Sequence, residues 1–387
     1  MSTDDPTALE YPYDSLPAPG HAIEIAPGLR WLRMRLPFAL DHINLWLLDD
    51  GETLAAVDCG FAREETREAW GAVLAADGRP LRRVVVTHHH PDHIGLATWL
   101  AARDDAAVHM TQGEFFAAQA VWHQLPGYCA SDMVEQFRRH GLDEMRRDAL
   151  LTRGNAYRVG APQVPGRYER MFAGDELRIG AHTWRVIVGF GHAPEHASLY
   201  CAELGVLIAG DMLLPRISTN VSVYAATPHG DALGWFLHSL REFCTLPDDT
   251  LVLPSHGKPF KGIRARVAQL VEHHRERCEV LLAACAMPQS AAALLPTLFP
   301  RELDTHQVMF AMGEAIAHLG SKVKLFDVAW QEEMTVTLVG SYEADPTQEM
   351  FSITSPMGSA LLGKGVGDEV EVEAPAGKQH YKILAVD

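Results

Sequence analysis

The residues with the clearest chemical potential lie in one short string, Thr87–His93, which reads THHHPDH. Its H-x-H-x-D-H spacing gathers imidazole and carboxylate groups, which are ligands that zinc and similar metals prefer. Placing several ligands on one loop also lowers the entropic cost of ordering them. The apolar run Val84–Val86 comes directly before the string, so we expect a buried strand to lead into it. The alternative is a solvated loop that happens to be rich in histidine.

Three more candidate ligands each follow an apolar run elsewhere in the chain. His192 follows RVIVGFG, Asp211 follows VLIAG and His256 follows TLVLPS. Strands that each end in such a residue would bring them together at one edge of a sheet, where α/β proteins place their sites. A lone histidine is more often structural, but four such placements in this order favour a functional centre.

The segments around these residues predict a layered α/β architecture. Strand-like runs occupy residues 28–58 and return between residues 176 and 210, and helical patterns are expected at residues 63–76, within 114–158, near 233–243, at 263–287 and twice within 288–319. After residue 319 the chain changes to strand-like segments, turn glycines and acidic residues. The expected division is therefore a catalytic domain at residues 1–262, a helical tail at 263–319 and a further domain at 320–387.

The first two of these segments resemble a known family. The residues that carry the likeness are Asp58 in VDCG, the THHHPDH string, Gly191–His192, Gly210–Asp211 and SHG at 255–257. Over residues 20–319 the chain resembles a metallo-β-lactamase-fold hydrolase of the glyoxalase II-like branch, with a partial winged-helix-like tail. The resemblance implies an αββα four-layer sandwich with two metal ions at one edge.

The resemblance also implies a role for each residue. One metal would be held by His88, His90 and His192, the other by Asp92, His93 and His256, with Asp211 bridging both. The ions would be two Zn²⁺, with Fe²⁺ or Mn²⁺ as alternatives, and a hydroxide bridging them would attack a small ester, thioester or lactone. Asp92 would also orient the hydroxide. Asp58 is expected to act from outside the ligand set by holding a ligand imidazole or the loop backbone; the alternative is a plain turn-forming residue.

The last segment resembles a different family. GSKV at 320–323, VGSYEADP at 339–346, FSITSPMGSALLGKGVGDEVEVEAP at 351–375 and YKILAVD at 381–387 are similar to the C-terminal FKBP-like α+β domain of Gre-type transcript-cleavage factors. In that family the domain docks on RNA polymerase, and the catalytic acids lie on a separate coiled coil that this chain lacks. The likeness implies polymerase contact through residues 320–387 without transcript cleavage. A generic small β domain is the alternative, and whether the fusion is natural or engineered stays open.

Composition limits the partners of this chain. It has 33 Lys+Arg against 50 Asp+Glu, a net charge of −17, so nucleic acid is not an expected partner. No apolar run reaches the length of a membrane span, and the acidic start of the sequence lacks the order of a signal peptide, so a cytoplasmic protein with no membrane contact is expected. The expected ligand is a small-molecule substrate, and the sequence leaves its identity and the oligomeric state open.

Three alternatives to the hydrolase remain. A mononuclear iron oxygenase related to persulfide dioxygenases would use only His88, His192 and Asp211. A small metal-dependent nuclease would share the fold, and a polymerase-binding module would carry an inert hydrolase.

Among the remaining histidines, His196 either supports the site or is structural, whereas the His273–His274 pair on a charged helix is expected to be solvated.

Overall fold

The computed structural model describes residues 9–285, 289–319, 322–328, 332–339, 346–352, 355–361, 364, 367–374 and 377–386. The chain divides into two compact units. The first unit comprises residues 1–129, 154–219 and 235–271, and the second comprises residues 130–153, 220–234 and 272–387. Within the described ranges, no helix is both long enough and apolar enough to cross a bilayer.

Two sheets form the centre of the first unit. The first has the strand order β1-β2-β3-β4-β5-β6-β7, antiparallel from β1 to β4 and parallel from β4 to β7. Its strands are β1 Ile23–Ala26, β2 Leu29–Arg35, β3 His42–Asp50, β4 Thr53–Val57, β5 Leu81–Val85, β6 Ala107–Met110 and β7 Glu169–Arg170. The second has the order β12-β11-β10-β9-β8, in which only β11 and β12 are parallel. Its strands are β8 Glu176–Ile179, β9 His182–Gly189, β10 His196–Cys201, β11 Val206–Gly210 and β12 Leu251–Pro254.

The central strands are apolar on both faces because both faces are covered. In β3, Ile43, Leu45 and Leu47 belong to one buried cluster, whereas Trp46 and Leu48 belong to another. This alternation is the two-residue period of a strand. The first cluster also contains residues of helices α1 (Glu64–Asp77) and α3 (Ala97–Asp104), and the second contains residues of both sheets. The two sheets therefore pack face to face, with helices outside.

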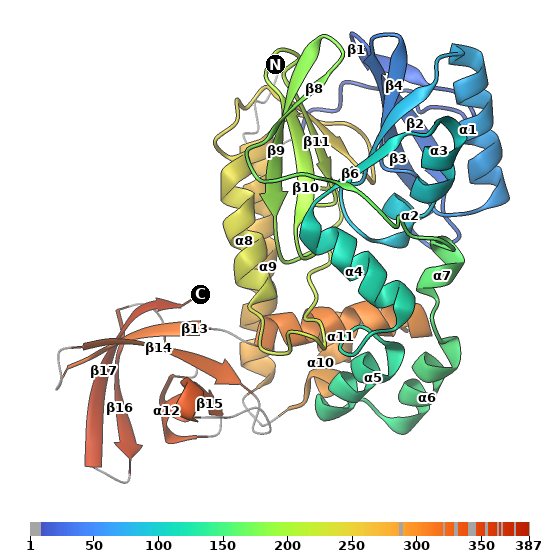
Figure 1. Cartoon of the computed structure of the whole chain (residues 1–387). Helices are drawn as coiled ribbons and strands as arrows, with labels where there is room; N and C mark the ends of the chain where they lie inside the picture. The colour runs from blue at the N-terminus through green and yellow to red at the C-terminus, as the bar shows by residue number, and fades with distance from the viewer. Residues whose placement is uncertain are drawn as a thin grey trace. The chain divides into compact units, whose positions relative to one another are not determined.

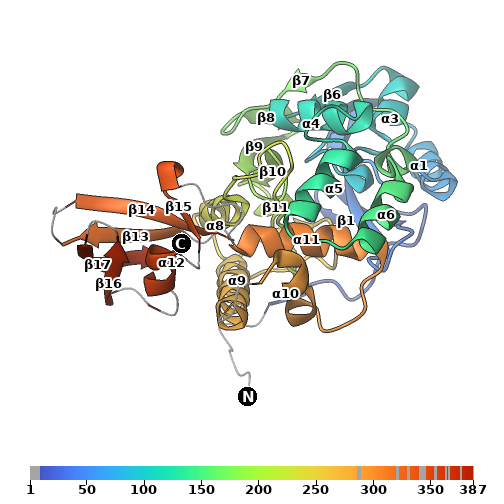
Figure 2. The ribbon, with the colours of Figure 1, turned by 90° about the horizontal axis from the view of Figure 1, so that it is seen from below.

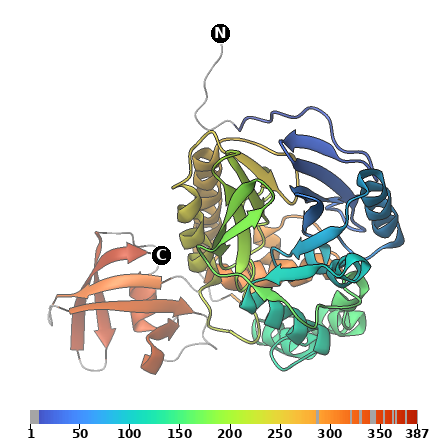
Figure 3. The same cartoon turned by 45° about the horizontal axis from the view of Figure 1, so that its top comes forward.

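The layers run helix, sheet, sheet, helix, which confirms the αββα fold class predicted from the sequence. Figure 1 shows α1 and α3 outside the seven-stranded sheet and α8 (Ala232–Phe243) outside the five-stranded sheet, and Figure 3 shows the same order from another side. The remaining helices of the first unit are α2 Pro91–Ile94, α4 Gln112–His123 and α7 Tyr157–Gly160, and α9 Ile263–Ala284 begins there and continues into the second unit.

The second unit contains helices and a small mixed domain. Its helices are α5 Ala130–Arg139, α6 Glu144–Arg153, α10 Ala291–Leu298 and α11 Thr305–Leu319. The third sheet has the order β15-β14-β13-β17-β16, and Figure 2 shows helix α12 beside its strands. The core of this domain includes residues of α12. Its elements are β13 Lys322–Asp327, β14 Glu332–Val339, η1 Pro346–Gln348, β15 Met350–Ser352, α12 Pro356–Leu361, β16 Glu369–Ala374 and β17 Gly377–Val386. This confirms a small C-terminal α+β domain. Parts of the quoted motifs lie outside the described residues, namely 320–321, 340–345, 353–354, 362–363, 365–366, 375 and 387.

One expectation about the helical tail is wrong. His274 is not solvated but 1% exposed, and its Nδ1 lies 3.0 Å from Nε2 of His318. His318 donates from Nδ1 to the carbonyl oxygen of Glu314, which leaves its Nε2 to accept a hydrogen bond from His274. Burial, and then the neighbouring His318, lowers the pKa of His274 to about 3. His274 and His318 therefore form a neutral hydrogen-bonded pair between α9 and α11.

Candidate metal centre

The predicted site residues follow the carboxyl ends of five strands in the first unit. Asp58 follows β4; His88 and His90 lie in the loop after β5; Asp92 and His93 lie on α2; and His192, Asp211 and His256 follow β9, β11 and β12. Strands of both sheets deliver their ends to the same edge, so residues far apart in sequence meet there. The structure brings together all seven of the predicted metal ligands.

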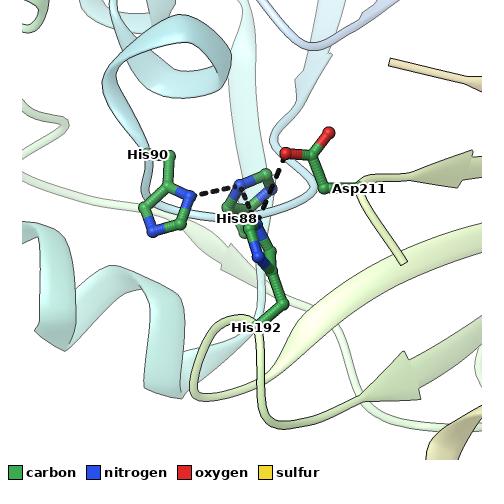
Figure 4. Close-up of side chains that lie close together, drawn as sticks. All are labelled: His88, His90, His192 and Asp211. Atoms are coloured by element: carbon green, nitrogen blue, oxygen red, sulfur yellow. Dashed lines mark hydrogen bonds and ion pairs between the residues drawn. The ribbon is translucent and has the colours of Figure 1, made fainter. Parts of the chain in front are cut away.

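Four of these side chains form a first group, shown in Figure 4. In His88, His90, His192 and Asp211, one possible ligand atom per residue lies within 4.8 Å of the others. Nε2 of His88 is 2.9 Å from Nδ1 of His90 and 3.2 Å from Nε2 of His192. Oδ2 of Asp211 is 3.4 Å from Nε2 of His192. Three imidazole nitrogens and one carboxylate oxygen thus converge on one small volume.

Asp92, His93 and His256 form a second group on the other side of Asp211. Oδ1 of Asp211 lies 3.6 Å from Nε2 of His93 and 3.4 Å from Nε2 of His256. Oδ2 of Asp92 lies 3.7 Å and 3.5 Å from the same two nitrogens. The two oxygens of Asp211 therefore face different groups.

The donor set fits a pair of cations. Nε2 of His93 and Oδ1 of Asp211 are buried and have no hydrogen-bond partner among the described residues. Leaving such groups unpaired in the interior costs about 1–3 kcal/mol each, so the site is built for something that binds them. Nitrogen and oxygen donors in this mixture suit zinc, iron or manganese.

Charge interactions in the site favour ionised aspartate and separate the histidines into two kinds. Burial and then the imidazole of His93 hold the pKa of His88 well below its ordinary value, so His88 is neutral and its ring nitrogen could bind a cation. Burial also opposes the charged form of His93, but Asp58, Asp92 and Asp211 outweigh it and raise the pKa of His93 well above its ordinary value. Burial would raise the pKa of Asp211, yet His256 and His93 hold it well below its usual range. A cation bound by the second group would replace the proton that these carboxylates otherwise favour on His93.

Asp58 lies outside both groups and holds the parts that carry them. Its Oδ2 is 2.8 Å from Nδ1 of His93, and its two oxygens accept hydrogen bonds from the backbone N–H and the hydroxyl of Thr87, both at 2.8 Å. When Nδ1 of His93 carries the proton that Asp58 accepts, Nε2 of the neutral ring faces Asp211 with its lone pair available to a metal ion. Both contacts that the sequence suggested for Asp58, an imidazole and the loop backbone, are present.

His42 has the same effect on His256, and nothing in the sequence singled it out. The carbonyl oxygen of His42 accepts from Nδ1 of His256 at 2.7 Å, and Nε2 of His42 accepts from the backbone N–H of Gly257 at 2.8 Å. His42 is one polar residue at the start of an apolar strand, and its partners are about 214 positions away in sequence. No local pattern could reveal that pairing.

His196 supports the backbone of Asp211. Burial and then His192 lower the pKa of His196 to about 4, so its ring is neutral, and its Nε2 accepts a hydrogen bond from the N–H of Asp211 at 3.1 Å. The Thr219 hydroxyl donates to the carbonyl oxygen of Asp211 at 2.6 Å. The aspartate is thus held at both of its backbone polar groups.

Gly210 must lack a side chain for this arrangement. Its φ is +56°, and an added Cβ would lie 2.3 Å from Nε2 of His196. We predict that Gly210→Ala lowers the free energy of unfolding by about 1–2 kcal/mol for the left-handed backbone and by about 1–3 kcal/mol more for the crowding. Gly205, at the other end of β11, has a φ of +61° and no atom within 4 Å of an added Cβ. Urea unfolding of Gly205→Ala isolates the backbone cost; equal losses in the two variants would contradict the crowding argument.

Comparisons with known proteins match the two resemblances separately. The model of the Metallo-beta-lactamase superfamily matches residues 39–256, and that of the Metallo-beta-lactamase-like C-terminal domain matches residues 278–324. The model of the Transcription elongation factor GreA/GreB C-terminal domain matches residues 313–387. The last two ranges overlap, and the boundary between residues 319 and 320 stays a prediction.

Curated relatives follow the same division. The Probable metallo-hydrolase YqjP of Bacillus subtilis is 26% identical over 303 residues, which cover 74% of this chain and 90% of YqjP. Transcription elongation factor GreA of Clostridium acetobutylicum is 51% identical over 71 residues, which cover 18% of this chain and 45% of GreA. The chain therefore spans less than half the length of that factor.

Solved structures agree with the first match. A Beta-lactamase domain protein from Burkholderia ambifaria is 46% identical, with a TM-score of 0.75, and the likeness covers 85% of this chain and 98% of the other. A metallo-beta-lactamase family protein from Thermus thermophilus is 31% identical, with a TM-score of 0.66, covering 76% and 93% of the two chains. By its fold, by these relatives and by a family match over more than half its length, this chain belongs to the metallo-beta-lactamase superfamily.

Proposed function

We propose that the chain is a dinuclear metal-dependent hydrolase of a small ester, thioester or lactone, within the glyoxalase II-like branch. One observation carries the proposal: the two oxygens of Asp211 face two separate groups of buried donors. Two bound ions would supply Lewis-acid polarisation of a carbonyl and a water that loses its proton near neutral pH. Zn²⁺ suits the donors best, with Fe²⁺ and Mn²⁺ as alternatives.

The protein's own residues provide position and charge. His88, His90 and His192 would hold one ion, Asp92, His93 and His256 the other, and Asp211 would contact both. Asp58 and His42 keep Nε2 of His93 and of His256 free, because each accepts the Nδ1 proton of its partner. The Asp92 side chain is 19% exposed against 10% for Asp211, so Asp92 is the carboxylate that can also contact the attacking water.

Metal analysis combined with a substrate panel tests this proposal. Full-length protein loaded with Zn²⁺ should contain two ions per chain and hydrolyse at least one class among thioesters, lactones and simple esters, with activity lost to a chelator and restored by Zn²⁺. One iron per chain, together with oxygen consumption on persulfide substrates, would contradict it and favour the mononuclear oxygenase. Cleavage restricted to phosphodiesters would favour the nuclease.

For residues 320–387 we propose docking on RNA polymerase, supported by the 51% identity to a GreA over 71 residues. The proposal requires a cytoplasmic protein. Full-length protein should co-purify with polymerase core enzyme, a chain ending at Leu319 should not, and excess GreA should displace it. His88→Ala should bind equally well, because the metal centre lies in the other unit. Equal binding by the shortened chain would contradict the docking role.

A further inference from the structure

Glu114 is a fully buried carboxylate close to the metal groups, but it belongs to neither of them. Glu114 on α4 is 0% exposed, and its side chain accepts three hydrogen bonds. Oε2 accepts the backbone N–H of His89 at 2.8 Å and lies 2.6 Å from Nδ1 of the same residue. Oε1 accepts the backbone N–H of Glu195 at 2.7 Å. A buried carboxylate is costly unless it is paired in this way, so the arrangement is specific.

The two bonds from Glu114 to His89 hold the residue that lies between the proposed ligands His88 and His90. His89 stands between His88 and His90, whose ring centroids are 4.5 Å apart, and turns its own imidazole to Glu114. The Tyr157 hydroxyl donates to the carbonyl oxygen of His89 at 2.6 Å. The N–H, the ring and the carbonyl of His89 are therefore all held, and the backbone on either side has little freedom to reorient the ligand rings.

The third bond ties in the loop that carries His192. Glu195 lies three residues after His192, and its own side chain accepts the N–H of Gly113, next to Glu114, at 2.7 Å. The carbonyl oxygen of Glu195 accepts the Thr111 hydroxyl at 2.7 Å. An added Cβ on Gly113 would lie 2.8 Å from Cγ of Glu195, so the two segments approach closely because residue 113 has no side chain. The start of α4 and this loop are joined from both directions.

We infer that Glu114 is a positioning residue that locks the His88–His90 loop to the His192 loop and so sets the spacing of the three imidazoles of the first metal group. This inference rests on the proposed function, since it assigns a role toward the same metal centre. Glu114 acts through His89 and Glu195, neither of which is among the seven proposed ligands. The three rings come from two loops, one with His88 and His90 and the other with His192. The Glu114 carboxylate accepts hydrogen bonds from both loops, so the spacing of the rings depends on Glu114.

Glutamine is the sharpest replacement because it keeps the shape and removes acceptor capacity. One end of its amide is an NH₂ group, which would face an N–H of His89 or of Glu195 instead of accepting from it. Glu114→Gln should therefore loosen one loop against the other. We expect Zn²⁺ affinity to fall about 10- to 100-fold, the effect typical of residues that orient metal ligands.

The experiment compares Zn²⁺ affinity by chelator competition, ions bound per chain, and the visible absorption of the Co²⁺-loaded protein. The matched control is Asp104→Asn, which also replaces a carboxylate by an amide. The Asp104 carboxylate accepts the backbone N–H of Leu81 at 2.9 Å, and Leu81 lies at the end of β5 that is remote from the proposed ligands. Glu114→Gln should lower the affinity and change the Co²⁺ spectrum, whereas Asp104→Asn should leave both unchanged. Tyr157→Phe, a milder variant, should shift the affinity in the same direction.

The outcomes separate this inference from the proposed function. Wild-type protein that binds one Zn²⁺, with an affinity that falls in Glu114→Gln, would overturn the dinuclear proposal alone, whereas wild-type protein that binds no Zn²⁺ would overturn both. Wild-type protein that binds two ions, with unchanged affinity and Co²⁺ spectrum in Glu114→Gln, would overturn the inference alone. If Glu114→Gln does not fold, Glu114→Asp decides by the same two measurements, because its shorter side chain keeps the charge but cannot bond to both loops at the present distances.

Discussion

Asp211→Ala should leave the protein folded but with less than one metal ion per chain and almost no turnover. Asp211 supplies an oxygen to each group of donors, 3.4 Å from Nε2 of His192 on one side and 3.4 Å from Nε2 of His256 on the other. Its removal also takes away the negative charge that offsets the buried imidazoles. A loss of one such electrostatic contact costs about 10²–10³-fold in turnover, and this residue makes two, so we expect about 10³-fold or more.

Asp248→Ala is the matched control, because it removes the same charge from an exposed position in the same unit. It should keep the metal content and turnover of the wild type. Metal analysis of both variants after loading with Zn²⁺ gives the first result, and hydrolysis of the substrate found by the panel gives the second. Full metal content and full turnover in Asp211→Ala would reject the proposed centre.

The position of the seven candidate ligands could be predicted from sequence because these residues follow local rules, whereas their division into two metal groups came from the family resemblance. Four of the seven lie within six residues of one another, and each of the other three ends an apolar strand, so knowing the strands is enough to expect them at one sheet edge. The alternation in β3 similarly depends only on the two-residue period and on coverage of both faces. These are properties that a short window of sequence contains.

The residues that orient the ligands could not be predicted in the same way. Glu114 is one acidic residue in the first turn of a helix, where acidic residues are common for helix stability alone. Its burial and its bonds to His89 and Glu195 depend on how α4 packs against two loops up to 81 positions away. The burial of His274 escapes prediction for the same reason: its helix has charged residues around it, and only packing on α11 shows which face is buried.

His256→Ala separates the dinuclear hydrolase from the mononuclear oxygenase. Nε2 of His256 lies 3.4 Å from Asp211 and 3.5 Å from Asp92, so it belongs to the second group alone. The oxygenase would hold its iron with His88, His192 and Asp211 and would not need His256. The hydrolase needs both ions, so we expect the variant to bind one ion instead of two and to lose about 10²–10³-fold in turnover.

His182→Ala is the matched control, since His182 begins β9, at the opposite end of that strand from the loop that carries His192. It should bind two ions and turn over at the wild-type rate. Metal analysis and steady-state kinetics at saturating Zn²⁺ distinguish the cases, because excess metal would refill a merely weakened second group. Two ions per chain and undiminished turnover in His256→Ala, at limiting as well as at saturating Zn²⁺, would contradict a ligand role for His256. One ion with full turnover would mean that the first group, with Asp211, performs the chemistry alone.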